Sequence, residues 1–330
     1  MHRIKALAAA VAIILAPGFA AAQEVRVGYW ASGVSAGLGF VLEDGKFLEK
    51  EGLKPSWVQF TKLAEVNRAL ISKSIDIAVA GGTVPSLRLG AEGVPAKIIA
   101  SDIVADANFV VPEDSPIKTL ADLKGKRIGS TPPGSTAYAL VATILKRNYG
   151  MTDKDFQQVP SGEAQLLTFM QRGEIQAALM RTITLRQLGP AAKVRVIGTV
   201  PQEWKKLIKA DSPPVLGVAV VDSAFNEKNP EVTVKFMLAL MKAVKWGAAH
   251  QADVAAILKT RLNMNDAEAT AYASAWTSNY FASLEEADIQ SLLQMAEVFK
   301  AEDNFPGTVT RDVFLPEPYQ KAKALMGSAK

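Results

Sequence analysis

The chain has 330 residues, of which 49% are hydrophobic and 21% are charged, and its formal net charge is +4. This size and composition predict an ordered globular protein large enough for two lobes, and they exclude a disordered or low-complexity chain. The chain contains no cysteine, which excludes disulfides, thiolate metal sites and a cysteine nucleophile.

The N-terminus has the pattern of a secretory signal peptide. A basic start, MHRIK, precedes an apolar run, and small residues end that run at Ala20–Ala22. Pro17 interrupts the run, which is shorter than the roughly 20 residues of a membrane-spanning helix. We therefore expect residues 1–22 to be cleaved near Ala22 and the mature protein to be periplasmic. The mature chain keeps 35 basic and 33 acidic residues, a balance that does not predict binding to nucleic acid.

In the first part of the mature chain, short apolar strands alternate with helical patterns. Strands are predicted at 25–30, 53–60, 74–82 and 96–101. The helix after the second strand carries on one face Leu63, Val66, Leu70 and Ile71. Pro85 is typical of the first turn of the helix after the third strand. This alternation predicts an α/β fold with parallel sheets.

A similar pattern begins again about 100 residues later. KRIGST (126–131) resembles VRVGYW (25–30), and RGEIQAALM (172–180) resembles KSIDIAVAG (73–81). Gly129 lies 101 positions after Gly28, and Ile175 lies 100 positions after Ile75. These steady offsets predict two lobes built on one plan, with chance similarity among α/β units as the alternative.

Two extended stretches are expected to connect the lobes. Residues 108–120 leave the first lobe and residues 212–225 return to it, which predicts a hinge beside a cleft. The predicted organisation is a signal peptide at 1–22, a first lobe at 23–108 and 216–330, and a second lobe at 109–215. After the return, helices are predicted from Pro230 to Trp246, with Asn229 as the cap, and at 251–262, 266–280 and 285–301.

The sequence offers few groups for catalysis. His2 lies in the predicted signal peptide, and His250 lies at the end of a helix, where an exposed or capping histidine is the ordinary role. No metalloprotease, Walker A, nucleophile-elbow or dinucleotide-binding motif occurs. We therefore expect no catalytic residues, no metal site and no cofactor.

Candidate binding groups lie where strands end and helices begin, which is where open parallel sheets bind ligands. In TPPGSTAYAL (131–140), a Pro-Gly turn precedes a helix with an apolar face. Ser135 or Thr136 would cap this helix, and Gly134 would let a ligand approach the backbone. The free amides and partial positive charge of a helix start suit an anion, although a capped helix is also an ordinary structural feature.

The run KTLADLKGKRIGSTPPGSTAYALVATIL (118–145) resembles the periplasmic solute-binding proteins of ABC importers for taurine, alkanesulfonates, nitrate and thiamine precursors. The resemblance extends over nearly all of the mature chain, including FLEKEGLKPSWVQF, LLTFMQRGEIQAALM and NPEVTVKFMLALMKAVKW. It implies the two-lobed periplasmic-binding-protein fold (type II), in which two strand-connected Rossmann-like lobes close over a ligand in the cleft. It also implies a monomer that delivers the ligand to an ABC permease in the inner membrane.

The resemblance implies ligand contacts in three places. These are the loop with Trp30, Ala31 and Ser32, the turn with Gly82 and Thr83, and the helix start with Gly134, Ser135 and Thr136. Trp30 would cover the body of the ligand, or it packs in the core. Trp204, Trp246 and Trp276 lie on helical patterns and are predicted in the core.

Arg181 departs from the family pattern, because relatives often carry an acidic or aromatic segment after the strand that matches QAALM. An arginine in the cleft would clamp a carboxylate or sulfonate, and the alternative is a salt bridge at the surface or between the lobes. Asp102 and Asp211 would recognise an ammonium group on a zwitterionic ligand, or they serve turns and caps.

The sequence thus predicts a non-enzymatic ABC solute-binding protein that captures a small organic anion by hinge closure. The anion is expected to be a sulfonate or a carboxylate, with an aliphatic or aromatic body. Two other functions stay open at this point: an enzyme, such as a dehydratase or lyase, on the same bilobal fold, and an exported partner of a sensor kinase.

Overall fold

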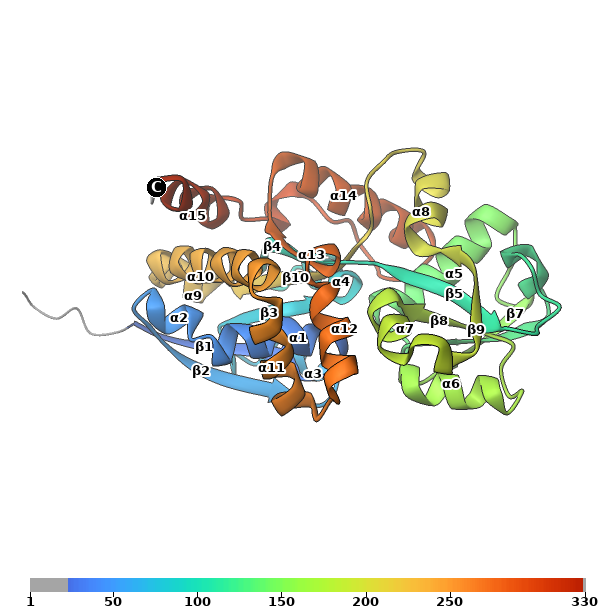
Figure 1. Cartoon of the computed structure of the whole chain (residues 1–330). Helices are drawn as coiled ribbons and strands as arrows, with labels where there is room; N and C mark the ends of the chain where they lie inside the picture. The colour runs from blue at the N-terminus through green and yellow to red at the C-terminus, as the bar shows by residue number, and fades with distance from the viewer. Residues whose placement is uncertain (1–22, 329–330) are drawn as a thin grey trace, which may run out of the picture.

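The computed structural model describes residues 23–328 as two lobes, each built around one β-sheet (Figure 1). The predicted signal peptide lies outside the described residues. Within residues 23–328, no helix is long and apolar enough to cross a membrane.

Lobe 1 contains a six-stranded sheet with the order β11-β4-β10-β3-β1-β2. Its strands are β1 (Gln23–Trp30), β2 (Leu53–Phe60), β3 (Ile77–Gly82), β4 (Ala96–Val104), β10 (Val215–Asp222) and β11 (Tyr280–Ser283). Its first helices are α1 (Gly33–Asp44), α2 (Phe47–Lys50), α3 (Leu63–Ile71) and α4 (Thr83–Ala91). The C-terminal part adds α9 (Ser223–Lys228), α10 (Pro230–Ala249), α11 (Gln251–Leu262), α12 (Asp266–Ser274), α13 (Trp276–Asn279), α14 (Glu286–Ala301), the short η3 (Arg311–Val313) and α15 (Glu317–Ser328).

Lobe 2 contains a five-stranded sheet with the order β7-β6-β8-β5-β9. Its strands are β5 (Ala107–Pro112), β6 (Lys126–Ser130), β7 (Phe156–Pro160), β8 (Ala177–Arg181) and β9 (Val194–Thr199). Its helices are α5 (Thr136–Tyr149), α6 (Glu163–Gln171), α7 (Thr182–Leu188) and α8 (Val200–Ile208), with the short η1 (Leu120–Leu123) and η2 (Gly189–Ala192).

The two sheets repeat one arrangement, as the sequence offsets predict. β1 pairs in parallel with β2 and β3, and β6 pairs in parallel with β7 and β8. A Cβ added at Gly28 would lie 2.6 Å from Ile75 Cδ1, and one added at Gly129 would lie 2.7 Å from Ile175 Cδ1. The repeat is therefore confirmed, because both glycines leave room for the same isoleucine of the repeated pattern.

The chain crosses between the sheets twice, at residues 105–106 and 209–214. β5 enters the second sheet antiparallel to β8, and β10 enters the first sheet antiparallel to β3. Beside the crossings, α7 of lobe 2 packs on α12 of lobe 1 (Figure 1). Trp204 on α8 also packs against Phe299 on α14, with ring centroids 5.8 Å apart.

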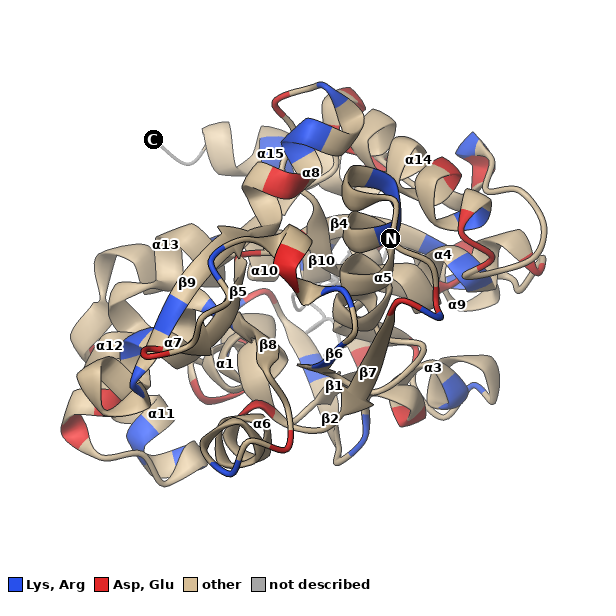
Figure 2. Ribbon diagram, turned by 90° about the vertical axis from the view of Figure 1, so that its right-hand side faces the viewer, with Lys and Arg blue, Asp and Glu red and all other residues tan. Residues whose placement is uncertain are grey.

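Charge is distributed unequally between the two lobes. Residues 107–208 carry 14 Lys and Arg against 8 Asp and Glu. Residues 23–106 and 209–330 together carry 21 against 25. Along the ribbon, the Lys and Arg positions are nevertheless spread over the molecule and mixed with Asp and Glu positions (Figure 2).

The predicted helix at 266–280 is confirmed except for a break at Ala275 and for its last residue, Tyr280. α12 ends at Ser274, the short α13 follows, and Tyr280 begins β11, where it pairs with Ile103 of β4. Trp276 is fully buried there and donates from Nε1 to Val244 O, at 2.9 Å. Tertiary contacts thus end the helix before the apolar pattern does.

The burial of the tryptophans, of His250 and of Ile71 can be compared with the predictions. Trp204 and Trp276 are buried in the core, as predicted, and Trp246 is partly buried against it. His250 is exposed at the end of α10 and stacks on Trp246, with centroids 4.9 Å apart. Ile71, in contrast, is 52% exposed, so its predicted place on the buried face of α3 is wrong. It is the last residue of that helix.

Candidate functional site

Arg181 makes the first contact between the lobes at the strand ends, which we call the Arg181 contact. It is the last residue of β8, and its guanidinium lies against Gly33, the first residue of α1 in lobe 1. A Cβ added at Gly33 would lie only 2.1 Å from Arg181 Nη1. Gly33 also has a φ of 58°, in the left-handed region that favours glycine. Any other residue at position 33 would therefore displace the guanidinium from its place.

Glu163 holds Arg181 from within lobe 2. Its Oε1 accepts from Arg181 Nε at 2.6 Å and from the Arg181 backbone N–H at 3.2 Å, and Thr184 Oγ1 donates to Oε2. Glu163 begins α6, and its side chain is only 6% exposed. Burial alone would lower the pKa of Arg181, but the Glu163 carboxylate outweighs that effect and raises this pKa above its ordinary value. Arg181 thus forms a salt bridge inside its own lobe while its Nη atoms face the other lobe.

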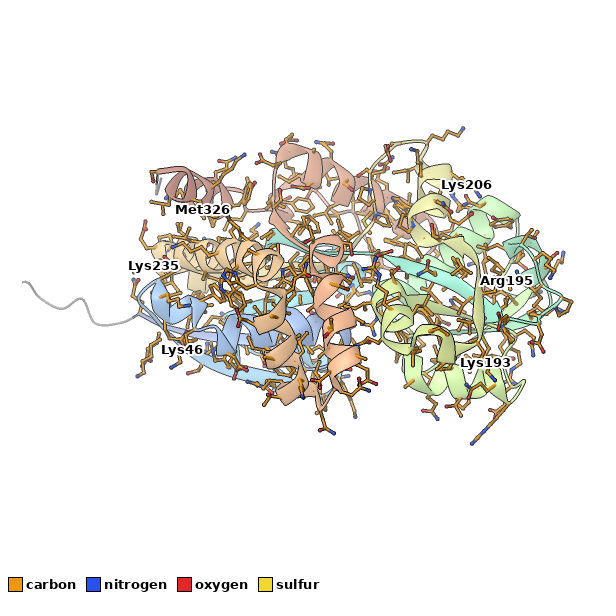
Figure 3. The ribbon with its side chains drawn as sticks, viewed as in Figure 1. Lys46, Lys193, Arg195, Lys206, Lys235 and Met326 are labelled. Atoms are coloured by element: carbon orange, nitrogen blue, oxygen red, sulfur yellow. The ribbon has the colours of Figure 1, made fainter. Side chains whose placement is uncertain are left out.

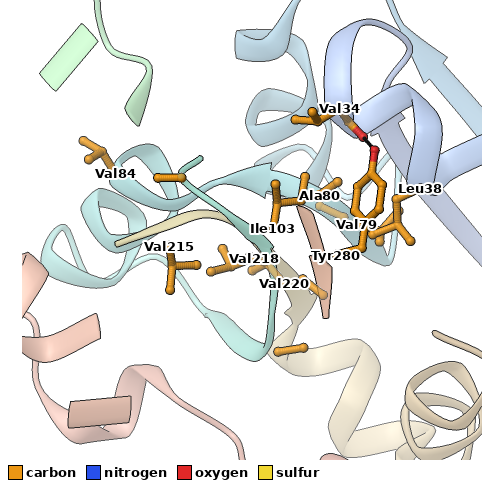
Figure 4. Packing of buried hydrophobic residues seen from close by; sticks show 14 of the residues in the cluster. Val34, Leu38, Val79, Ala80, Val84, Ile103, Val215, Val218, Val220 and Tyr280 are labelled. Carbon is orange, nitrogen blue, oxygen red and sulfur yellow. Dashed lines mark hydrogen bonds between the residues drawn. The ribbon is translucent and has the colours of Figure 1, made fainter. Parts of the chain in front are cut away.

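Two tyrosines fix the start of α1. Tyr272 Oη donates to Gly33 O at 3.1 Å, Tyr280 Oη donates to Val34 O at 2.7 Å, and the two hydroxyls lie 2.6 Å apart. Figure 4 shows Tyr280 pointing at Val34 from β11. Burial raises the pKa of Tyr272 to about 12 and that of Tyr280 well above its usual range. Both hydroxyls are therefore neutral donors at physiological pH.

The start of α1 has an uncompensated positive end. The first turn of any helix has free amides and a partial positive charge. Ser32 occupies the N-cap position, but within the described residues its side chain makes no capping hydrogen bond. The Arg181 contact therefore brings a guanidinium and an uncapped helix start together, an arrangement that an anion between them would stabilise.

Thr136 makes the second contact, which we call the Thr136 contact. It is the first residue of α5 in lobe 2, and its Oγ1 accepts from the Val84 backbone N–H of α4 in lobe 1 at 3.1 Å. A Cβ added at Gly82 would lie 3.5 Å from the same Oγ1. Lobe 2 thus supplies a side-chain cap to a helix of lobe 1, whose own N-cap residue, Gly82, has no side chain.

The start of α5 is capped from within. Of the two predicted candidates, Ser135 is the N-cap: its Oγ accepts from the Tyr138 N–H at 3.3 Å and donates to Pro132 O at 2.7 Å. Gly134 is exposed with a φ of 83°, and a Cβ added there would meet nothing within 4 Å. The predicted ligand contact of Gly134 stays a prediction.

The remaining predicted site residues have the following surroundings in the structure. Trp30 is partly buried, packs on the core and donates from Nε1 to Thr61 O at 3.1 Å, while Ala31 follows it and pairs back to Phe60. Thr83 is fully buried at the start of α4. Asp211 is 87% exposed and pairs with Lys205.

Asp102 shapes the end of β3. Its Oδ2 accepts from the Ala80 N–H at 2.8 Å, and Ser35 Oγ donates to Ala80 O at 2.9 Å. Ala80 has a φ of 54°, unusual for a non-glycine residue, and it lies where the pairing of β3 with β10 shifts register. Asp102 is fully buried, and within the described residues its Oδ1 has no hydrogen-bond partner. Burial raises the pKa of Asp102 to about 8.

Sequence reasoning missed Glu163, Tyr272 and Tyr280. Glu163 gives a weak signal, since an acidic residue directly after Ser161-Gly162 is typical of a helix start. The tyrosines give none, because they approach α1 from more than 230 positions away in the chain. Among residues 23–328, no group of three or more His, Cys, Asp or Glu could hold a metal ion.

Comparisons with known proteins agree with this architecture. The family model described as "ABC transporter, phosphonate, periplasmic substrate-binding protein" matches residues 47–262. The taurine-binding periplasmic protein of Escherichia coli is 28% identical over 219 residues, which span 66% of this chain and 64% of that protein, slightly less than two thirds of its length.

Two solved structures show the same fold at identities too low to indicate function. The alkanesulfonate-binding protein SsuA from Xanthomonas axonopodis pv. citri, bound to MOPS, aligns with a TM-score of 0.73 at 20% identity, covering 89% of this chain and 98% of that one. The desulfurization enzyme DSZB aligns with a TM-score of 0.67 at 13% identity, covering 92% and 99%. Because the family model matches more than half of the sequence, the chain belongs to the family of periplasmic substrate-binding proteins of ABC transporters that this model describes.

Proposed function

We propose that this protein captures a small organic anion, a sulfonate or a carboxylate, and delivers it to an ABC permease in the inner membrane. The observation that carries the proposal is the Arg181 contact. Arg181 faces the uncapped start of α1, so the two positive groups come from different lobes. An anion held between them would stabilise the lobes together.

The places where these groups are attached support capture by hinge closure. Arg181 is fixed to Glu163 in lobe 2, and Gly33 is fixed by Tyr272 in lobe 1, so only relative movement of the lobes changes their separation. A ligand that contacts both lobes favours the closed form, because it gains its full set of interactions only there. The Thr136 contact would add a direct hydrogen bond between the lobes in that form.

The likeness of the curated taurine-binding relative supports a sulfonate among the candidate anions. Trp30 and the turn at Gly82 and Thr83 remain the residues proposed for the body of the ligand. Gly134, Ser135 and Thr136 remain proposed for its negative group, alongside Arg181.

Isothermal titration calorimetry with a panel of sulfonates and carboxylates tests this function. We expect at least one of them to bind tightly, with X-ray scattering showing a more compact protein in its presence. If none binds, while a cationic ligand or a neutral pyrimidine binds tightly, the anion proposal is wrong.

An enzyme on the same fold is the alternative from another class. The likeness to DSZB concerns the fold alone at 13% identity. His250, the one histidine of the mature chain, is exposed and stacks on Trp246, where Nδ1 lies 2.9 Å from Trp246 O. We therefore propose a binding protein without catalytic residues, and turnover of a bound ligand would contradict this.

A further inference from the structure

We propose that Glu163 determines which charge on the ligand's head group the anion site accepts. Through its ion pair with Arg181, it makes the anion site accept a monoanionic head group, such as a sulfonate, and reject a dianionic one, such as a fully ionised phosphonate. This inference rests on the proposed function and narrows its substrate class. Glu163 is a positioning residue here, because it acts on the ligand through Arg181.

The charges at the Arg181 contact nearly cancel before a ligand arrives. Arg181 brings one positive charge, and Glu163, 2.6 Å from Nε, brings one negative charge. Tyr272 and Tyr280 bring none, because burial raises the pKa of both hydroxyls. What remains is the partial positive charge of the α1 start, about half an elementary charge.

A ligand with one negative charge fits the small net positive charge of the Arg181 contact. The Nη side of Arg181 and the amides of α1 can hold that charge directly, as charge-assisted hydrogen bonds. A second negative charge would face the Glu163 carboxylate behind the guanidinium without a cation of its own. Like charges repel strongly where water is excluded, so the second charge lowers affinity.

Glu163 cannot easily turn away from a dianion. Its carboxylate accepts hydrogen bonds from Arg181 Nε, from the Arg181 backbone N–H and from Thr184 Oγ1. All three donors belong to lobe 2, so the pair stays intact when the lobes separate. Arg181 is therefore oriented before the ligand binds, and its charge is already balanced.

The experiment compares head groups of the same shape and different charge. Calorimetry measures the Kd of ethanesulfonate against ethylphosphonate, and of benzenesulfonate against phenylphosphonate, at about pH 6 and about pH 9. The sulfonates are monoanions at both pH values, whereas the phosphonates change from mostly monoanions to mostly dianions. We expect the phosphonate-to-sulfonate Kd ratio to rise by about tenfold or more from the lower to the higher pH.

Glu163→Gln is the informative variant, because glutamine keeps an oxygen that can accept from Arg181. We expect most of the rise in the ratio to disappear in this variant. Glu163→Ala should weaken binding of sulfonates as well, since Arg181 loses its anchor, and Glu163→Gln should recover part of that loss. A purely structural glutamate would not change the dependence on head-group charge.

Glu203→Gln is the matched control. Glu203 is also a buried carboxylate of lobe 2, where Lys206 Nζ donates to it at 2.6 Å and Asn148 Nδ2 at 2.9 Å. Lys206 lies on α8 at the upper edge of lobe 2 (Figure 3). This variant removes the same charge from the same lobe, and we expect the Kd ratio to stay as in the unaltered protein.

Two results would overturn the inference while leaving the proposed function intact. One is an unaltered protein that binds the dianionic phosphonate as tightly as the sulfonate, a result that needs no variant to fold. The other is a Kd ratio that rises equally in Glu163→Gln and in the unaltered protein. If the unaltered protein binds no sulfonate or carboxylate, the proposed function itself falls, and this inference with it.

Discussion

The Arg181 contact and the Thr136 contact occupy equivalent places in the two halves of the molecule. α1 follows β1 as α5 follows β6, and α4 follows β3 as α7 follows β8. One contact joins the end of β8 to the start of α1, and the other joins the start of α5 to the turn after β3. The same arrangement therefore occurs twice: lobe 2 contacts a helix start of lobe 1 once through a guanidinium and once through a hydroxyl.

This difference teaches which contact is complete without a ligand. At the Thr136 contact, a hydroxyl of one lobe caps a helix of the other, so donor and acceptor satisfy each other. At the Arg181 contact, two positive groups meet and only one is neutralised, by Glu163. The first contact suits a latch between the lobes, whose hydroxyl can still donate to the ligand's negative group, and the second suits the main anion site.

The largest expected effect comes from removing the guanidinium. Arg181→Ala should weaken sulfonate binding by about 100-fold or more, since a charged group then lacks its partner in a buried site. Arg181→Lys keeps the charge but cannot pair through Nε with Glu163, so it should recover only part of the affinity. Calorimetry measures both, with Arg186→Ala, an exposed residue of α7, as control. Equal affinity in Arg181→Ala and the control would remove the anion site from this contact.

In lobe 1, the buried Asp102 at the irregular end of β3 predicts a pH effect on stability. The pKa of Asp102 is about 8 in the folded protein, above its ordinary value of 3.8, so the folded state holds this proton more tightly than the unfolded state. The free energy of unfolding should fall by about 1 kcal/mol per pH unit as pH rises from about 5 to about 8. It should level off above the folded pKa.

Asp102→Asn should remove this contribution, because asparagine keeps an acceptor for the Ala80 N–H but does not ionise. Urea unfolding at several pH values measures the slope. Asp211→Asn, an exposed carboxylate, serves as control. Identical slopes in Asp102→Asn and the unaltered protein would contradict the buried, protonated state.

Two glycines with positive φ angles extend the comparison of the two contacts. Gly33 has a φ of 58° and Gly134 a φ of 83°, and both lie at the start of equivalent helices. Alanine at either position should cost about 1 kcal/mol of stability. Gly33→Ala should in addition weaken binding by about tenfold or more, because its Cβ would collide with Arg181.

Gly134→Ala meets open space in the structure, so a smaller effect on binding is expected. Melting temperatures and Kd values of the two variants separate strain from collision. Equal losses of affinity would place the ligand at the α5 start as much as at the α1 start.

The smallest effect is expected at the Thr136 contact. The double variant Ser135→Ala with Thr136→Ala should weaken binding while the fold stays intact. Thr136→Val alone should weaken binding about fivefold, since one hydrogen bond between the lobes is lost, and Thr136→Ser should restore it. Ser135→Ala alone should lower stability by about 1 kcal/mol through loss of the helix cap.

Calorimetry and thermal unfolding distinguish these variants. A loss of binding in Ser135→Ala with no change in Thr136→Val would assign the ligand contact to Ser135 instead.

Much of the fold can be predicted from local patterns in the sequence. The strand at 53–60, the helix at 251–262 and the buried face of α5 are as predicted, because apolar periodicity reports which side of an element is covered. The repeat of Gly28 and Ile75 as Gly129 and Ile175 is likewise visible from the sequence alone, because the same residue types recur at nearly the same offset in both halves.

The candidate site depends on what the sequence leaves undecided. Residue type and position, at a strand end for Arg181 and at a helix start for Thr136, were enough to single out these residues, but not to decide what they touch. Arg181 meets Gly33 and Thr136 meets Val84 only because two lobes, joined by two crossings, turn these strand ends toward each other. Local apolar periodicity determines where each helix or strand forms and which face it buries. Only the long-range packing of the two lobes decides that the Arg181 guanidinium lies opposite the start of α1.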